Sequence, residues 1–229
     1  MCLNFVLSIV ASLLVAIIFY IIEILKKSKI TLLTQTDSII DDDGAPPAAV
    51  NGSRIKEKLV RVKVKNKESF LGITRYPARG VHARISFLTE TNQKECEREM
   101  HGRWASLEKP FIYLPSDTIP QFGQAVTRVG ISPELFRNSE YIDIHAGDEE
   151  ALEIVVKIEN EEISYGWCNE SFLENHRHKQ FRLNKGIHKV VVKVQWDAGV
   201  EKSEFILHDG GSLDTFFLDK HNRVVQIKR

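Results

Sequence analysis

One cysteine and two histidines are the residues of this sequence best suited to chemistry. Cys168 is followed by His176 and His178, which are separated by a single residue. Two histidines in this pattern can bind one metal ion. Zn²⁺ needs three or four protein ligands, however, and nothing in the spacing beyond the proximity of Glu174 and His188 supplies the others. The polar sequence around the histidines, NHRHKQ, favours an exposed loop instead. We therefore expect neither a metal nor another cofactor.

The cysteines give no strong sign of catalysis. A thiol becomes a nucleophile where a base or a positive environment lowers its pKa, and the spacing of Cys96 and Cys168 shows neither. A disulfide between them remains an alternative, although the polar sequence around Cys96 is unlike that of a core strand. The common phosphate-binding, dinucleotide-binding, metalloprotease and serine-hydrolase motifs are absent. We expect a protein that is not an enzyme; the alternative is a membrane-tethered hydrolase or metal-dependent enzyme with a site near Cys168, His176 and His178.

A short aromatic segment, ISYGWCNESF, is the best candidate for a binding surface. Tyr165 and Trp167 can bury their rings while their polar ends form hydrogen bonds. Asn169 and Glu170 can satisfy nearby backbone groups. These four residues suit a structural corner of the fold, and the alternative is that they form a ligand-binding surface.

Composition limits the classes of protein that fit the chain. Its 229 residues include 43% hydrophobic and 27% charged residues, as in ordinary globular domains. The 31 Lys and Arg balance the 31 Asp and Glu. A dedicated nucleic-acid-binding protein normally carries a basic excess, so we expect no nucleic-acid partner.

The first part of the chain is typical of a transmembrane helix. The segment from Phe5 to Ile22 contains no charged residue. At 1.5 Å per residue it spans about 27 Å, close to the thickness of the hydrocarbon core. A cleaved signal peptide needs a basic start and a small-residue cleavage site, and neither is present here. We expect residues 1–29 to form an uncleaved anchor with a basic flank.

Basic residues predict the orientation of this anchor. Lys26, Lys27 and Lys29 follow the apolar segment, and no Lys or Arg precedes it. Because Lys and Arg concentrate on the cytoplasmic side of membrane proteins, we expect the C-terminal domain in the cytoplasm. An extracytoplasmic domain is the alternative.

The remainder of the chain divides into a linker and one β-rich domain. Residues 30–54 contain Asp41–Asp43, Pro46, Pro47 and Gly52, a composition typical of an extended linker, with a short strand or helix at its start as an option. Residues 55–229 then alternate apolar and polar side chains, as half-buried strands do. The inward positions are Val60, Val62 and Val64; Val81, Ala83, Ile85 and Phe87; Leu152, Ile154, Val156 and Ile158; and Val190, Val192, Val194 and Trp196. Such strands, separated by turns, predict an antiparallel sandwich or barrel.

The segment of about residues 106–141 interrupts this pattern. It contains Pro110, Pro115, Pro120 and Pro133. Proline removes a hydrogen-bond donor from a strand, so we expect a long structured connection. A connection of this length often carries function, and we regard it as a candidate recognition surface or, equally, as a lid over one end of the domain.

Several segments in order resemble uncharacterised prokaryotic membrane-anchored proteins with an immunoglobulin-like domain. The resemblance rests on the following segments: the hairpin from about Leu59 to Leu88, HGRWA (His101–Ala105), DIHAGDEEALEIVVKI (Asp143–Ile158), SYGWCNESF and FRLNKGIHKVVVKV (Phe181–Val194). It covers about 170 residues and implies an all-β, immunoglobulin-like antiparallel β-sandwich, without a reaction, ligand or catalytic residue. Those proteins often have serine where this chain has Cys168, which argues against a thiol function.

Together these observations predict a single-pass, membrane-anchored binding or adaptor module. Its expected partners are the lipid bilayer and a protein whose identity the sequence does not give. A homo-oligomer is an additional option. Anchoring would raise the effective concentration of the domain toward other membrane partners.

Overall fold

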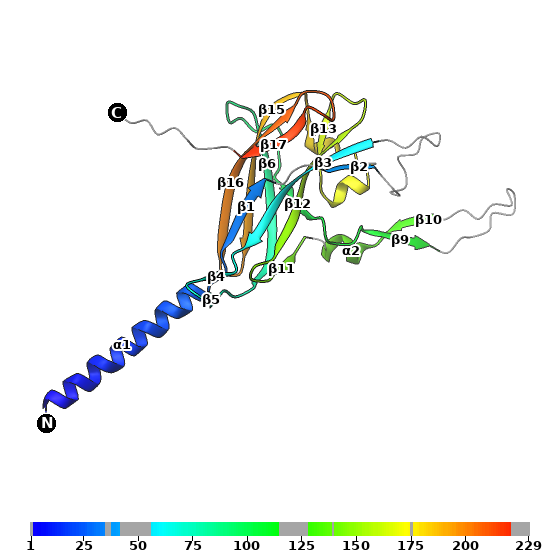
Figure 1. Ribbon diagram of the computed structural model, residues 1–229. Coiled ribbons are helices and arrows are strands. Elements are labelled where there is room, and N and C mark those ends of the chain that lie inside the picture. The colour runs from blue at the N-terminus through cyan, green and yellow to red at the C-terminus, as the bar shows by residue number, and fades with distance from the viewer. Residues whose placement is uncertain are drawn as a thin grey trace, which may run out of the picture.

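The computed structural model describes residues 2–34, 38–41, 56–114, 128–138, 140–174 and 176–220, and these form one long helix and a body of antiparallel strands (Figure 1). Helix α1 (Cys2–Lys26) extends away from the body, and strand β1 begins four residues after it, at Ile30. The predicted all-β class is confirmed at this level.

Two large sheets make up the body. The first has the strand order β1 (Ile30–Thr34), β3 (Lys56–Asn66), β12 (Glu149–Ile158), β13 (Ser164–Gly166) and β14 (Arg182–Leu183), while β2 (Ser38–Asp41) also pairs with β3 and β8 (Arg103–Trp104) with β12. The second has the order β11 (Ile142–Ile144), β6 (Ala78–Leu88), β15 (Gly186–Trp196), β16 (Gly199–Asp209) and β17 (Phe216–Lys220), with β7 (Met100–His101) beside β6. All of these pairings are antiparallel.

The two sheets share one apolar core. The alternating residues of β3, β6 and β15 supply its centre, as the sequence predicts: Val60, Val62, Val64, Val81, Ala83, Ile85, Phe87, Val190, Val192 and Val194 are all buried in it. Trp196 packs against this core while partly exposed. Burial of one face of each strand is what fixes its register, because a slip of one residue would turn the apolar side chains outward.

Strand β12 departs from the predicted alternation. Its pairing with β3 shifts register between Glu153 and Val155, which is the signature of a β-bulge. Val155 therefore joins the central core, whereas Val156 and Ile158 join a second apolar cluster. The expectation that Leu152, Ile154, Val156 and Ile158 share one face is wrong, because the bulge reverses the face of every residue after it.

The body begins earlier than the sequence suggests. Within the expected linker of residues 30–54, β1 and β2 both pair with β3. Ile30 and Leu32 are buried in the core, and their burial explains why this part of the segment becomes a strand. Residues 42–55, which include the acidic and proline-rich part, lie outside the described residues.

The connection at about residues 106–141 contains a separate hairpin. Strands β9 (Phe111–Leu114) and β10 (Arg128–Ile131) pair only with each other among the described residues, and helix α2 (Pro133–Asn138) follows. Figure 1 shows the hairpin extending away from the two sheets. The base of the connection is attached to the body, since Trp104 Nε1 donates to Glu140 O at 3.3 Å. Residues 115–127 lie outside the described part of the chain.

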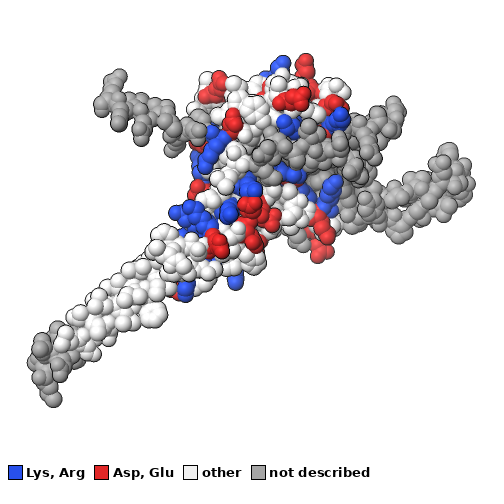
Figure 2. All heavy atoms as spheres, in the orientation of Figure 1, with Lys and Arg blue, Asp and Glu red and all other residues white. Residues whose placement is uncertain are grey.

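Helix α1 has the length and composition of a membrane-spanning helix. Residues Leu7–Lys26 form a 20-residue candidate span with mean hydropathy 2.6, none of it buried against the body. Large apolar side chains such as Phe19, 64% exposed, cover its surface. Figure 2 shows almost no charge on the visible surface of the helix, whereas both signs of charge appear where it meets the body.

The body holds the end of α1 directly. A short hairpin, β4 (Ser69–Phe70) and β5 (Ile73–Thr74), contacts the helix. Just after it, Arg75 Nη1 donates to the carbonyl oxygens of Leu25 (3.2 Å) and Lys27 (2.8 Å). The Tyr76 hydroxyl donates to Glu23, and the Tyr76 backbone N–H to Lys26 O. These groups satisfy helix-end carbonyls that would otherwise lack partners, and we call this set of contacts the helix clamp.

Candidate functional site

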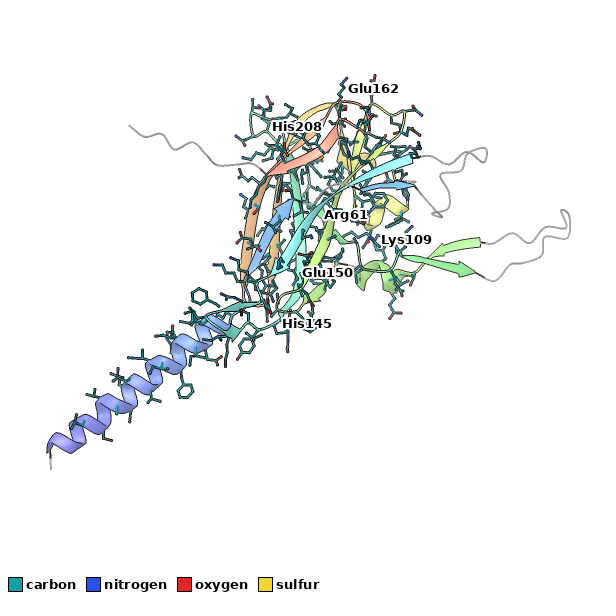
Figure 3. All side chains as sticks on the ribbon, in the orientation of Figure 1. Arg61, Lys109, His145, Glu150, Glu162 and His208 are labelled. Carbon is teal, nitrogen blue, oxygen red and sulfur yellow. The ribbon has the colours of Figure 1, made fainter. Side chains whose placement is uncertain are left out.

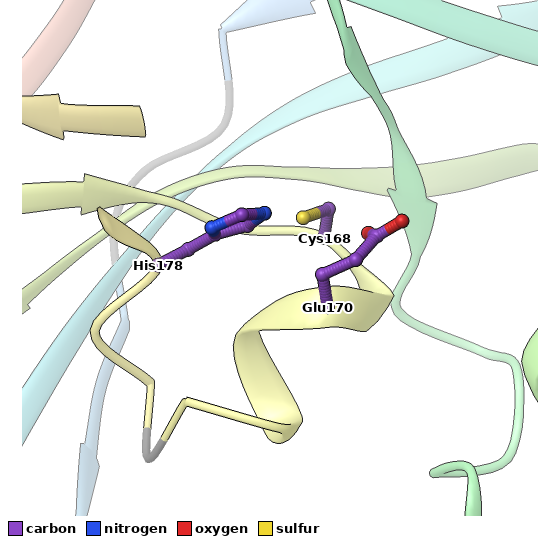
Figure 4. A group of neighbouring side chains, drawn as sticks. All are labelled: Cys168, Glu170 and His178. Atoms are coloured by element: carbon purple, nitrogen blue, oxygen red, sulfur yellow. The ribbon is translucent and has the colours of Figure 1, made fainter. Parts of the chain in front are cut away.

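Cys168, Glu170 and His178 come together beside the first sheet, in the segment that follows β13 (Figure 4). Cys168 caps the short helix η1 (Asn169–Phe172), which carries Glu170, and His178 caps the short helix η2 (Lys179–Phe181). One ligand atom from each side chain lies within 4.8 Å of the other two. Sulfur, carboxylate oxygen and imidazole nitrogen are all ligands that Zn²⁺ accepts.

Local hydrogen bonds and close packing fix the position of Cys168. Its backbone N–H donates to Ser171 Oγ at 3.0 Å, and the Ser171 hydroxyl donates to Gly166 O at 3.1 Å. Gly166 is needed here for space, because a Cβ at this position would lie 2.7 Å from Met100 Sδ and 2.8 Å from Phe181 Cβ. These hydrogen bonds and this close packing hold the backbone of Cys168, and with it the sulfur, in one position.

The cluster is mostly removed from water. Cys168 is 1% exposed and His178 5% exposed, while Glu170 is half-buried. Burial, and then the negative charge of Glu170, raise the pKa of the Cys168 thiol. Cys168 is therefore a neutral thiol at physiological pH in the metal-free protein, which does not suit a nucleophile.

The imidazole of His178 is incompletely paired. Its Nδ1 is buried, and among the described residues it has no hydrogen-bond partner. Glu174 Oε2 lies 3.7 Å from this Nδ1, beyond hydrogen-bonding distance. A buried polar atom without a partner is unusual and indicates a position where a ligand could contribute.

Glu170 and His178 also face an open hollow. It has a volume of about 340 Å³, and its lining includes Arg98, Glu99 and His101 from the chain around β7. Water or a small polar molecule can therefore approach two of the three clustered residues. A metal held here would have room for a ligand that does not come from the protein.

The two histidines of the H-x-H pattern have different environments. His176 has a positive φ of 66°, and its Nδ1 lies 2.8 and 2.9 Å from the carboxylate oxygens of Glu57. Its ring packs edge-on against Trp167, with 4.7 Å between the ring centroids. His188 is also engaged elsewhere, 2.7 Å from the Glu95 carboxylate. Of the three residues of the alternative site, Cys168 and His178 therefore lie together, whereas His176 contacts Glu57 instead.

The segment named as a possible binding surface is largely buried. Tyr165, Trp167 and Asn169 are 7%, 4% and 5% exposed, so that expectation is corrected for these three residues. The Tyr165 hydroxyl donates to Glu161, Trp167 Nε1 to Glu153 at 2.7 Å, and Asn169 Nδ2 to Phe136 O. Their burial and these hydrogen bonds agree with the structural corner that the sequence favoured.

Glu153 organises the polar contacts beneath this corner. Its carboxylate accepts from Arg61 Nη2 at 2.9 Å and from Arg103 Nη1 at 2.8 Å, in addition to Trp167. Arg103 in turn lies over the ring of Phe172, 5.1 Å from its centroid. The buried carboxylate is therefore fully engaged in structure and is a poor candidate for acid–base catalysis.

Sequence reasoning identified Cys168 and His178 as chemical candidates but did not group Glu170 with them. No spacing rule connects the three, because their proximity depends on the two short helices and on the turn at His176. Comparison of the chain with protein-family models, with curated protein sequences and with solved structures gives no match.

Proposed function

We propose that this protein is a single-pass, membrane-anchored binding or adaptor module, whose β-domain is held at the membrane surface in a fixed orientation. The observation that carries the proposal is the helix clamp. A freely tethered domain would need a flexible segment after the helix, whereas here Arg75 and Tyr76 bond the last turn of α1 to the body. The exposed apolar surface of α1 supports its insertion into lipid, since a helix that is apolar all round needs an apolar environment.

The body is an immunoglobulin-like β-sandwich in this proposal. In immunoglobulin-type domains strand B pairs with E, and F lies between C and G and pairs with both. The pairing of β3 with β12, and of β15 with both β6 and β16, agrees with this pattern when β1, β3, β6, β12, β15 and β16 are taken as A, B, C, E, F and G. The domain departs from the pattern at its edges, where β13 and β14 follow β12 and where β17 extends the second sheet.

The C-terminal domain is assigned to the cytoplasm, with the extracytoplasmic side as the alternative. The supporting observation is the placement of Lys26, Lys27 and Lys29 at the body end of α1. The β9–β10 hairpin is our candidate for the surface that meets a protein partner, because it stands apart from both sheets. Neither nucleic acid nor a resident cofactor belongs to this proposal.

A labelling experiment with the full chain tests both anchoring and sidedness. Ile187 is 46% exposed and pairs with His208, which Figure 3 places at the end of the body far from α1. We would introduce Ile187→Cys into a Cys2→Ser background and treat intact cells with an impermeant thiol reagent. We expect the protein in the membrane fraction, with labelling only after the cells are permeabilised. Recovery in the aqueous fraction without detergent would refute the anchor, and labelling of intact cells would reverse the orientation.

A metal-dependent function is the second candidate, and the cluster of Cys168, Glu170 and His178 favours it. Three ligands of the kinds that Zn²⁺ uses, next to an open hollow, match the general plan of a catalytic zinc site. In such a site the metal lowers the pKa of a bound water and makes it a nucleophile.

Metal titration of the purified full chain in detergent tests this candidate. This candidate predicts one Zn²⁺ per chain, and Co²⁺ should then give a near-ultraviolet thiolate-to-metal absorption. Cys168→Ser should remove that absorption, while Cys96→Ser, which changes another buried thiol outside the cluster, should retain it. Circular dichroism would verify that both variants fold. Absence of the absorption from folded wild-type protein, or its persistence in Cys168→Ser, would reject a metal site here.

A further inference from the structure

The hairpin β4–β5 exposes an apolar tip next to the membrane helix. Phe70 is 47% exposed and Leu71 82% exposed. The turn requires left-handed backbone at two successive residues, with φ of 51° at Leu71 and 76° at Gly72. Leucine is an unfavourable residue for such a position in water, on both conformational and hydrophobic grounds. An exposed apolar tip of this kind needs a partner surface or an apolar environment.

The position of the hairpin along α1 supplies that environment. The candidate span Leu7–Lys26 has 20 residues, which at 1.5 Å per residue fill a hydrocarbon core of about 30 Å. Its last turn, from Glu23 to Lys26, therefore lies at the boundary between hydrocarbon and headgroups. The β4–β5 hairpin contacts the helix, and Arg75 and Tyr76 bond to this turn, so the hairpin lies at about the same depth.

The charges near the hairpin also suit a lipid surface. The Arg75 guanidinium lies over the Phe70 ring, 6.0 Å from its centroid. Lys67, Lys27 and Lys29 are exposed near the hairpin, and the acidic side chains in this region are Glu23, Glu68 and Asp148. Glu23 is already paired with Lys26 at 3.0 Å, so the balance facing the headgroups is basic. Basic residues that flank an apolar tip favour the interface of a membrane with anionic lipids.

We propose that the β4–β5 hairpin inserts Phe70 and Leu71 into the interfacial zone of the bilayer that α1 crosses. This inference rests on the proposed membrane anchor. The hairpin gives the domain a second point of contact with lipid, beside the helix. Together the two contacts restrict tilting of the body and set which of its faces points away from the membrane.

Depth-dependent quenching in reconstituted vesicles tests the inference. The full chain, in a Cys2→Ser background, would carry an environment-sensitive fluorophore at Leu71→Cys or, as a matched apolar control at the far end of the body, at Ile187→Cys. Both native positions are exposed, whereas Cys96 and Cys168 are buried. The vesicles would contain phosphatidylcholine and phosphatidylserine, with a quencher attached to lipid near the headgroups.

We expect strong quenching by the lipid-attached quencher at Leu71 and none at Ile187, with the opposite result for a water-soluble quencher. Equal exposure of both fluorophores to water, in protein that has entered the vesicles, would overturn the hairpin inference and leave the anchor intact. Failure of the chain to enter vesicles would instead overturn the anchor, and the hairpin inference with it.

Discussion

Lys157 and Asp209 form an ion pair that is entirely buried between the two sheets. Lys157 Nζ lies 2.9 and 3.2 Å from the two Asp209 carboxylate oxygens, and the side chains are 1% and 0% exposed. The bulge in β12 explains this arrangement, because it turns Lys157 toward the second sheet while Val156 and Ile158 face the outer cluster. Asp209 also accepts the backbone N–H of Gly211. The pair thus links the position of the bulge to the end of β16.

We predict that loss of one partner of this pair is costly. Lys157→Met should lower the free energy of unfolding by about 3–5 kcal/mol, because Asp209 would remain buried without a counter-charge. The double variant Lys157→Met/Asp209→Asn should lose less than the sum of the single changes, since neither charge remains. Urea unfolding of the full chain in detergent, followed by tryptophan fluorescence, measures these values. Additive losses would contradict coupling between the two residues.

The buried thiol of Cys96 gives a pH-dependent contribution to stability. Burial, assisted by the charge of Glu95, raises the pKa of Cys96 from 9.0 to about 11. Between these values the folded protein keeps the proton that the unfolded chain loses, so stability should fall as pH rises through this window. The contribution is at most about 3 kcal/mol, since each pKa unit is worth about 1.36 kcal/mol and solvent near the thiol reduces it. Cys96→Ser should show a shallower decline from pH 9 to 11 in urea unfolding, and an unchanged slope would refute the assignment.

At the scale of elements, the helix clamp converts an apolar helix and a β-domain into one connected unit. Arg75 donates to two carbonyl groups at the end of α1, and Lys29 N–H donates to the Asn66 side chain at 3.1 Å. Trp196 Nε1 donates to Ser28 Oγ at 2.8 Å. Both sheets therefore hold the short segment between α1 and β1, which explains how so short a connection can fix an orientation.

We predict that Arg75→Ala loosens this connection without unfolding the body. Hydrogen bonds from a charged group are worth about 1.5–3 kcal/mol each, so trypsin cleavage after Lys27 and Lys29 should accelerate by about tenfold or more. Arg79→Ala is the matched control, because Arg79 is exposed and lies outside the clamp. Cleavage of the full chain in detergent is followed by gel electrophoresis. Equal rates in the two variants would show that the clamp does not restrain the segment.

The elements of this protein differ in how far their sequence predicts them. Alternation predicted β3, β6 and β15, because each buries one face and a strand exposes side chains with a period of two. The alternation did not predict β12 correctly, because Val155 and Val156 are both apolar and are buried in two different clusters. It also did not reveal the Cys168–Glu170–His178 cluster. The chain turns at His176, which has a positive φ, so His176 and His178 contact different partners. The spacing of the two histidines in the sequence does not predict that turn.

At the scale of the whole molecule, the proposed contacts with lipid lie at one end and the candidate recognition elements lie elsewhere. Helix α1 and the β4–β5 hairpin meet at one end of the body, whereas the β9–β10 hairpin extends to its side (Figure 1). If the body cannot tilt freely, that hairpin is presented at a defined height above the membrane. An adaptor with this geometry would select partners that are themselves near the membrane, which is the advantage expected of confinement to a surface.

Moving basic residues from one end of α1 to the other tests the orientation of the whole molecule in the membrane. The variant Lys27→Gln/Lys29→Gln/Asn4→Lys loses two basic residues at the body end of α1 and gains one at the other end. Because Lys and Arg are retained on the cytoplasmic side, we expect a severalfold larger share of molecules to expose the domain outside the cell. Impermeant labelling of Ile187→Cys in the Cys2→Ser background measures that share. Lys179→Gln/Lys185→Gln removes two exposed lysines away from the helix and should leave labelling unchanged. An unaltered orientation in the charge-transfer variant would show that something other than the flanking lysines determines the side of the membrane.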